Sequence, residues 1–224
     1  MNIKGVIFDM DGVILDSEKL YVRFWKEAGR AFGYPWEVEH SLAIRSLARP
    51  YAIEKLKGFF GEDFDYDKVR GMRIRLMNAY IAEHGIEPKP HADYILKWLK
   101  ENGYKIAVAT ATPLERTEEY LGRIGLLGYF DKIISAHMVA HGKPAPDIYL
   151  RASEELGLNP KECIALEDSL NGLRSASAAG CNAVMVPDLD EPNDEAKKLI
   201  CAVAADLRDV KNVINNIDWK MQNV

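Results

Sequence analysis

Short apolar runs alternate with amphipathic segments along most of the chain. Runs rich in β-branched and aliphatic residues predict strands at positions 6–8, 106–110, 133–135, 163–166 and 183–186. Apolar residues three and four apart, followed by a glycine, predict helices over 114–124, 146–155 and 170–179. Thr112 is expected to start the first of these helices in a capping box with Glu115. Because strand–helix alternation builds a parallel sheet covered on both faces, we predict an α/β fold with a Rossmann-like, doubly wound parallel sheet.

Residues 17–85 show helical periodicity only. Ser17 or Asp16 can cap a first helix, whose apolar face carries Leu20, Phe24 and Ala28. A second helix is predicted over 67–84, with an apolar face formed by Val69, Met72, Leu76 and Tyr80. No convincing strand lies between the two. We therefore predict an α/β core formed by residues 1–16 and 86–224, and an inserted helical domain at 17–85.

Composition excludes some classes of partner. The 224 residues suffice for one α/β domain with a smaller insertion, and a hydrophobic content of 48% is typical of a globular protein. The net charge of -5 argues against a nucleic-acid partner, which requires a basic face. It does not exclude a small anionic substrate, because a few local cations and backbone N–H groups can outweigh the global charge.

The N-terminal segment and the cysteines indicate the compartment. The first apolar run is interrupted by two aspartates, so it is neither a signal peptide nor long enough to span a bilayer. Cys163, Cys181 and Cys201 lack metal-binding spacing and have apolar neighbours, which predicts free buried thiols in a reducing environment. We expect a cytoplasmic monomer that does not associate with membranes.

Two aspartates, Asp9 and Asp11, follow the first predicted strand. Residues i and i+2 of a strand point the same way, so both carboxylates project from its carboxyl end, where open parallel sheets bind ligands. Carboxylates this close resist joint ionisation unless a cation or a shared proton intervenes. A hard divalent ion such as Mg²⁺ accepts oxygen ligands of this kind. Taken alone, the pair is explained equally well by an ordinary Asp-Gly turn.

Three further predicted strands are also followed by residues whose side chains can take part in catalysis or bind ligands. Thr110 ends its strand just before a predicted helix start, where a hydroxyl beside free N–H groups forms an anion site. Lys143 lies in a loop stiffened by prolines, and Glu167 with Asp168 follows the next strand. Taken one at a time, each has an ordinary explanation: a threonine within a strand, a solvated loop lysine, and carboxylates that interact favourably with a helix dipole. Four consecutive strand ends of this kind together predict a single site.

Four segments, DMDGVILDS, VATAT, GKPAPDIY and ALEDSLNGLRSASAAG, resemble the four motifs of the haloacid dehalogenase superfamily in order. They are most similar to its β-phosphoglucomutase-like phosphatase subgroup, whose members insert a helical C1 cap after the first motif. The likeness covers about residues 1–16 and 86–190, whereas 17–85 matches in helical character and length more than in residues. The resemblance implies Mg²⁺-dependent hydrolysis of a small phosphate monoester, and a sugar phosphate is the leading expectation by analogy.

The resemblance also implies how catalysis and metal binding are divided. Asp9 would attack phosphorus and form an aspartyl-phosphate, and Asp11 would act first as general acid and then as general base. Mg²⁺ would be held by Asp9, the backbone carbonyl of Asp11 and Asp168. Glu167 would lie nearby or act through water.

The same resemblance implies how the transferring phosphoryl group is held. Thr110 and the N–H groups of Ala111 and Thr112 would bind it, and Lys143 would balance the charge on it and on Asp9. The helical cap would close over the site and exclude water.

The cap departs from the phosphomutases of the subgroup. Tyr21 stands where they carry a histidine, and the glycine of their phosphate-gripping loop is absent. Arg45 or Arg49 would supply the substrate-binding cation of that loop, and the sequence does not decide between them. Arg73 and Arg75 could also face the cleft, although a solvated helix face is the preferred interpretation. Tyr21 in place of the histidine and the missing loop glycine both favour a phosphatase over the alternative, a β-phosphoglucomutase-type mutase.

Two classes outside this enzyme family are more distant alternatives. A receiver-like phosphoacceptor also places acids, a threonine and a lysine at strand ends, but receivers are shorter, lack the insertion and carry the phosphorylated aspartate on a later strand. A non-catalytic binding protein of the same fold is disfavoured because every chemical position is retained. A haloacid dehalogenase in the strict sense would lack an acid at position 11, and because Asp11 is present this activity is not expected.

Overall fold

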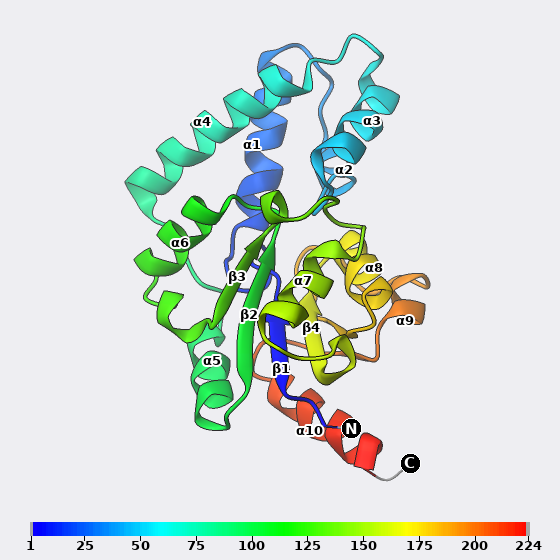
Figure 1. The fold of residues 1–224 in the computed structure, drawn as a ribbon. Coiled ribbons are helices and arrows are strands. Elements are labelled where there is room, and N and C mark those ends of the chain that lie inside the picture. Colours follow the sequence, from blue (N-terminus) through cyan, green and yellow to red (C-terminus); the bar gives the residue numbers. More distant parts are fainter. Residues whose placement is uncertain (1, 223–224) are drawn as a thin grey trace.

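The computed structural model describes the backbone of residues 2–222 and the side chains of residues 2–217. Its centre is a six-stranded sheet in which all neighbouring strands run parallel, in the order β3-β2-β1-β4-β5-β6 (Figure 1). The strands are β1 Gly5–Phe8, β2 Lys105–Thr110, β3 Lys132–Ser135, β4 Cys163–Glu167, β5 Asn182–Met185 and β6 Ala202–Val203. Each of the five predicted strands is found within one residue of its expected ends, and the sixth was not predicted.

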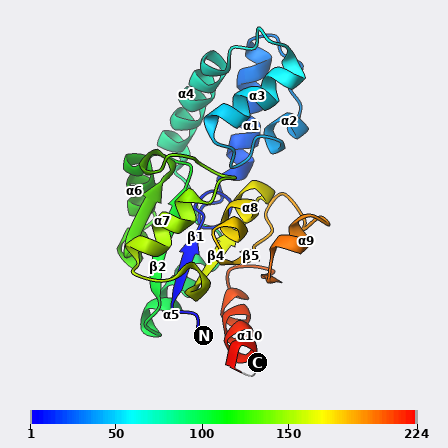
Figure 2. The same ribbon diagram turned by 45° about the vertical axis from the view of Figure 1, so that its right-hand side comes forward.

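Helices cover both faces of the sheet, as Figures 1 and 2 show. One face is covered by α5 Ala92–Glu101, α6 Leu114–Arg123 and α10 Val210–Gln222, and the other by α7 Asp147–Glu155, α8 Leu170–Ala178 and α9 Ala196–Leu199. Three short 3₁₀ helices complete the connections: η1 Leu127–Tyr129, η2 Ala136–Met138 and η3 Pro160–Glu162. Successive β1 residues point to opposite faces, so Val6 and Phe8 join one apolar core and Ile7 the other. The predicted doubly wound α/β fold is confirmed.

Four helices lie together at one end of the sheet (Figure 1). They are α1 Glu18–Ala31, α2 Val38–Leu42, α3 Arg49–Phe60 and α4 Tyr66–His84. They share an aromatic core of their own, in which the Trp25 and Trp36 rings stack with centroids 5.4 Å apart. Gly29 makes this contact possible, because a Cβ there would come within 2.3 Å of the Trp36 ring. We call these four helices and their connections, residues 17–85, the helical layer.

The buried face of α4 differs from the predicted one. Its buried residues are Tyr66, Val69, Arg73, Met77 and Ile81, whereas the residues of the predicted apolar face after Val69 are at most partly buried. The observed stripe has the three-to-four-residue spacing of a helix face. The prediction missed it because an arginine occupies its centre.

Two further observations concern the cysteines and the possibility of a membrane-spanning helix. Cys163 and Cys181 are buried free thiols as predicted, but Cys201 is exposed because it precedes the short edge strand β6. Within the described residues, no helix is both long and apolar enough to cross a membrane.

Candidate active site

The predicted strand-end residues meet at one edge of the sheet. Phe8, the last residue of β1, lies level with Val108 of β2 and Leu166 of β4. Asp9 therefore projects between the ends of both neighbouring strands, level with Ala109 and Glu167, and Thr110 is the residue after Ala109. This convergence follows from parallel pairing, which brings the carboxyl ends of strands to the same edge.

Lys143 reaches this edge from the loop between η2 and α7. Its Nζ donates to Asp9 Oδ1 at 2.7 Å and to the backbone carbonyl of Ala109 at 3.0 Å, and it lies 2.6 Å from Glu167 Oε1. The side chain is 2% exposed. Burial lowers the pKa of the Lys143 ammonium, but the charges of Asp9 and Glu167 outweigh burial and raise the pKa overall. Lys143 is therefore a permanent buried cation between two carboxylates.

Three buried carboxylates form a cluster beside this lysine. Asp9, Glu167 and Asp168 each offer an oxygen, and these oxygens lie within 4.8 Å of one another. Glu167 Oε2 and Asp168 Oδ1 are buried without a hydrogen-bond partner among the described residues. Burial raises the pKa of Glu167 to about 7 and also raises that of Asp168. Carboxylates with unpaired buried oxygens and raised pKa values are the donor set that fits a hard divalent cation.

Asp11 is held by two hydroxyls that were expected to cap helices. Ser17 Oγ donates to Asp11 Oδ1 at 2.6 Å, and Thr112 Oγ1 donates to Asp11 Oδ2 at 2.9 Å. Ser17 occupies the N-cap of α1 without a side-chain capping bond, and α6 starts at Leu114 with Pro113 as its N-cap. The predicted capping box at Thr112 is therefore wrong, because Asp11 engages the hydroxyl. Burial, and secondarily the charge of Asp9, raises the pKa of Asp11 to about 6.

The segment after β2 forms the other wall of the site. The backbone N–H of Thr112 donates to Thr110 Oγ1 at 3.0 Å, and the Thr112 carbonyl accepts from Ser135 Oγ at 2.8 Å. Ala111 and Thr112 border a cavity of about 400 Å³ that also contains Asp9 and Asp11 and extends under the helical layer. A cavity of this size can accommodate a small metabolite.

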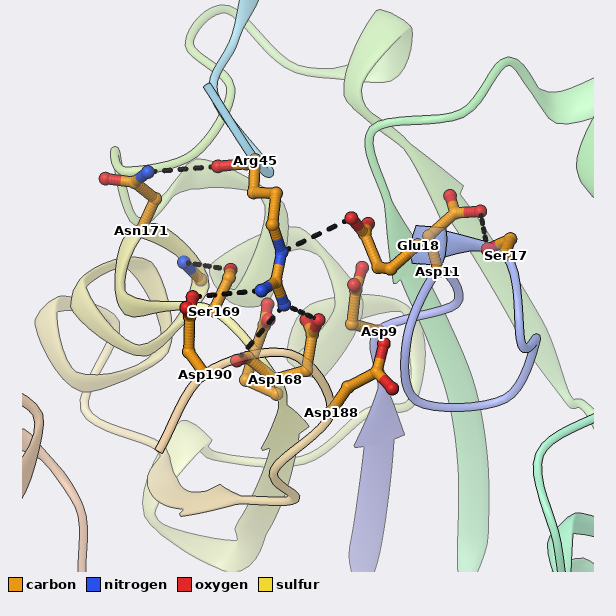
Figure 3. A network of polar contacts seen from close by, with 12 residues as sticks. Asp9, Asp11, Ser17, Glu18, Arg45, Asp168, Ser169, Asn171, Asp188 and Asp190 are labelled. Carbon is orange, nitrogen blue, oxygen red and sulfur yellow. Dashed lines mark hydrogen bonds and ion pairs between the residues drawn. The ribbon is translucent and has the colours of Figure 1, made fainter. Parts of the chain in front are cut away.

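Both arginines predicted from the loop after α2 border the same cavity, but their surroundings differ. The buried Arg45 points at the acidic cluster, and its guanidinium contacts carboxylates of Glu18, Asp168 and Asp190 (Figure 3). The Nε–Glu18 Oε2 and Nη1–Asp190 Oδ2 distances are 3.3 and 2.9 Å. Arg49 is exposed and pairs with the Asp67 carboxylate.

Several residues of the site were not predicted from the sequence. Glu18 lies in the first turn of α1, and burial raises its pKa to about 8. Asp188 and Asp190 follow β5, and Asp188 Oδ1 accepts from Lys89 at 2.6 Å. The reasoning applied to the other strand ends, extended to the end of β5, predicts both aspartates. Tyr149 was missed because it lies on α7, where its buried hydroxyl donates to Glu167.

Comparison with known proteins agrees with this geometry. A family model for haloacid dehalogenase-like hydrolases matches residues 3–180. The chain belongs to the haloacid dehalogenase-like hydrolase family.

Individual relatives identify the subgroup of this family that the chain resembles. Fructose-1-phosphate phosphatase YqaB of Escherichia coli is 30% identical over 81% of this chain and 95% of its own length. β-Phosphoglucomutase of Bacillus subtilis is 28% identical over 82% of this chain and 83% of its own. The crystal structure of CbbY from Rhodobacter sphaeroides in complex with phosphate superimposes with a TM-score of 0.73 at 28% identity, covering 92% of this chain and 95% of that chain. The predicted resemblance to the β-phosphoglucomutase-like subgroup is confirmed.

Proposed function

We propose that this protein is a magnesium-dependent phosphatase that hydrolyses a small sugar phosphate through an aspartyl-phosphate on Asp9. One observation carries the proposal: a buried lysine bridges Asp9 and Glu167 beside a cluster of carboxylates that fits a divalent cation. Residues 1–16 and 86–224 form the catalytic core in this proposal, and residues 17–85 act as the cap that covers it.

Asp9 is the nucleophile. Lys143 holds Asp9 Oδ1 at 2.7 Å, which orients the carboxylate and balances its charge. The second oxygen attacks phosphorus; the new Asp9–phosphorus bond forms as the bond from phosphorus to the ester oxygen breaks. Thr110 and the backbone N–H groups of Ala111 and Thr112 bind the phosphoryl oxygens, whose charge also faces Lys143. The Thr112 N–H, which donates to Thr110 Oγ1 in this structure, exchanges that bond for one to the phosphoryl group.

Asp11 moves the protons. With a pKa of about 6, its carboxyl retains a proton more readily than an exposed aspartate, and it donates that proton to the departing ester oxygen. In the second step it takes a proton from the water that attacks phosphorus, and the Asp9–phosphorus bond breaks to release inorganic phosphate. The hydroxyls of Ser17 and Thr112 fix the orientation of this carboxyl.

The metal ligands in this proposal are Asp9, Asp168 and the backbone carbonyl of Asp11, with Glu167 close by or acting through water. When bound, Mg²⁺ supplies positive charge that stabilises the transferring phosphoryl group and offsets the repulsion between its carboxylates and the substrate.

The substrate class rests on the relatives and on the cavity. The Escherichia coli relative is named as a phosphatase of fructose 1-phosphate, and the cavity of about 400 Å³ has the volume for a phosphorylated monosaccharide. Arg45 and Arg49 border it and are candidates for contact with the substrate.

The test measures phosphate release from a panel of sugar phosphates with Mg²⁺, for the natural protein and for Asp9→Asn. Asp93→Asn, at an exposed position of α5, is the matched control for the change of a carboxylate to an amide. Release that is abolished by EDTA and by Asp9→Asn, but not by Asp93→Asn, supports the proposal. A folded protein that releases no phosphate from any ester in the presence of Mg²⁺ refutes it.

The mutase alternative is tested in the same experiment, because one relative is named as a β-phosphoglucomutase. β-Glucose 1-phosphate is followed for conversion to glucose 6-phosphate. Tyr21 borders the cavity and burial raises the pKa of its hydroxyl; its phenol cannot exchange protons at neutral pH as an imidazole does. We expect hydrolysis without isomerisation, and conversion without net phosphate release would identify a mutase.

A further inference from the structure

Tyr149, on α7, is a fully buried polar side chain without a step of its own in the proposed reaction. It is not among the residues that border the cavity containing Asp9 and Asp11, so it does not contact a substrate there. Its hydroxyl nevertheless donates to Glu167 Oε1, and its ring lies 5.3 Å from Lys143 Nζ. Any effect of Tyr149 on the site must therefore act through these two neighbours.

Glu167 Oε1 accepts from two donors of the protein. Besides the Tyr149 hydroxyl, Lys143 Nζ lies 2.6 Å from this oxygen. A carboxylate oxygen has about two lone-pair sites, and these two donors occupy both. The Lys143 ammonium has three hydrogens, and its contacts with Glu167 Oε1, Asp9 Oδ1 and the Ala109 carbonyl account for all three. Lys143 therefore has no hydrogen left with which to replace the tyrosine hydroxyl.

The second oxygen of Glu167 is in the opposite situation. Oε2 is buried and has no hydrogen-bond partner among the described residues. The carboxylate lies against Gly172, where a Cβ would come within 2.0 Å of Cδ and of Oε2. A buried carboxylate oxygen without a donor is unfavourable unless a cation or a water molecule reaches it. The protein thus commits one oxygen of Glu167 to its own donors and leaves the other free.

We propose that Tyr149 is a positioning residue of the metal site, which holds Glu167 Oε1 and thereby keeps Oε2 available to Mg²⁺ or to a water bound to it. The terminal torsion of a glutamate is soft, so Lys143 alone does not fix the orientation of the carboxylate. The hydroxyl supplies the second contact that does. The proposal rests on the magnesium-dependent function above and assigns part of its metal affinity to a residue that touches neither metal nor substrate.

Calorimetric titration with Mg²⁺ tests this proposal on the natural protein, Tyr149→Phe and Ser153→Ala. Tyr149→Phe removes only the hydroxyl. Ser153→Ala is the matched control, because Ser153 is fully buried one turn further along α7 and its hydroxyl donates to the backbone carbonyl of Tyr149. We expect the Mg²⁺ dissociation constant to rise by about 10- to 100-fold in Tyr149→Phe, the usual effect of losing a partner that orients a metal ligand. It should stay unchanged in Ser153→Ala, although both variants lose a buried hydrogen bond and should have a lower Tm.

Phosphate release from a sugar phosphate separates positioning from loss of structure. In Tyr149→Phe, the Mg²⁺ concentration for half-maximal release should rise by the same factor as the dissociation constant. Excess Mg²⁺ should restore the rate, with the KM for the ester unchanged. A dissociation constant that is unchanged in Tyr149→Phe, or that rises equally in Ser153→Ala, overturns the inference.

A second variant, Glu167→Gln, applies if Tyr149→Phe does not fold by circular dichroism. It keeps the tyrosine and the shape of the carboxylate but removes its charge, so it should weaken Mg²⁺ binding by at least about 10-fold. Unchanged Mg²⁺ affinity in Glu167→Gln overturns the inference as well.

The two assays distinguish this inference from the phosphatase proposal. If Tyr149→Phe weakens Mg²⁺ binding but the natural protein hydrolyses no ester, the phosphatase proposal falls and the role of Tyr149 stands. If the natural protein hydrolyses an ester and Tyr149→Phe binds Mg²⁺ with equal affinity, the phosphatase proposal stands and the role of Tyr149 falls.

Discussion

Gly172, in the first turn of α8, lies against the carboxylate of Glu167 and provides a steric test of the site. A Cβ at this position would lie 2.0 Å from Glu167 Cδ, 2.0 Å from Oε2 and 2.2 Å from Oε1. Ordinary contacts to a Cβ begin at 3.4 Å, so Gly172→Ala must displace the carboxylate by more than 1 Å. The displacement would break the hydrogen bond from Tyr149 and separate Glu167 from Lys143.

The free energy of unfolding should fall for two reasons and rise for one. Overpacking in a buried site typically costs about 1–3 kcal/mol, and loss of hydrogen bonds to a buried charge costs about 1–3 kcal/mol. Replacing glycine by alanine in a helix restores about 1 kcal/mol. The centres of these ranges give a net loss of about 3 kcal/mol, which lowers the Tm of a protein of this size by about 6–12 °C. Misplacement of a group in the active site by about 1 Å should reduce kcat/KM by about 10²-fold.

Gly122→Ala is the matched control, because Gly122 is exposed near the end of α6 and a Cβ there would meet no atom closer than Leu127 Cδ2 at 4.0 Å. We expect this variant to be unchanged in activity and up to about 1 kcal/mol more stable. Both variants are compared by thermal unfolding, by calorimetric Mg²⁺ binding and by phosphate release. Gly172→Ala with the Tm, Mg²⁺ affinity and activity of Gly122→Ala would refute the steric argument and with it the position assigned to Glu167.

Two further predictions concern charge. Lys143→Met should lower kcat by about 10²- to 10³-fold, because Asp9 and Glu167 lose their buried cation; phosphate release with saturating Mg²⁺ measures this, and unchanged kcat contradicts it. Without Mg²⁺, Tm should fall between pH 5 and pH 8, because burial raises the pKa of Asp11 to about 6 and that of Glu18 to about 8, so the folded state binds protons more tightly than the unfolded state and loses this stabilisation as pH rises. Mg²⁺ should reduce the fall, and a Tm that is constant or rises without Mg²⁺ would contradict the reasoning.

The central acids and the lysine could be predicted from the sequence because their positions depend on local rules. A strand places residues i and i+2 on the same side, and parallel strands bring their carboxyl ends to one edge. These two rules are sufficient to predict that Asp9, Thr110 and Glu167 lie at the same edge of the sheet. Lys143 follows from its place in a constrained loop after β3, and the structure confirms that it reaches Asp9.

The contacts between the helical layer and the core could not be predicted in the same way. The pairing of Arg45 with Asp168 joins residues 123 positions apart and depends on how the helical layer packs over the sheet. Arg73 and Arg75 were treated alike in the sequence, but the structure separates them: helical periodicity places Arg73 on the buried stripe of α4 and Arg75 on its exposed side. Both arginines have apolar residues three or four positions away on each side, Val69 and Met77 for Arg73 and Met72 and Ala79 for Arg75, so this spacing alone does not separate them.

The balance of buried charge supports the proposal that the site binds a divalent cation. Two cations of the protein, Lys143 and Arg45, lie within the cluster of carboxylates formed by Asp9, Asp11, Glu18, Glu167 and Asp168. If all five carboxylates were ionised, Lys143 and Arg45 would leave three negative charges, and Arg73, whose charge acts on Asp11, would offset only one of them. The remaining negative charge is unfavourable in a region of low dielectric constant. Retained protons relieve part of this charge, as the raised pKa values of the carboxyl groups indicate. A divalent cation relieves it instead by allowing these protons to leave, so Mg²⁺ binding should release protons and strengthen as pH rises. Because Arg45 contacts Asp168 from the helical layer, the same binding event should also loosen the contact between that layer and the core.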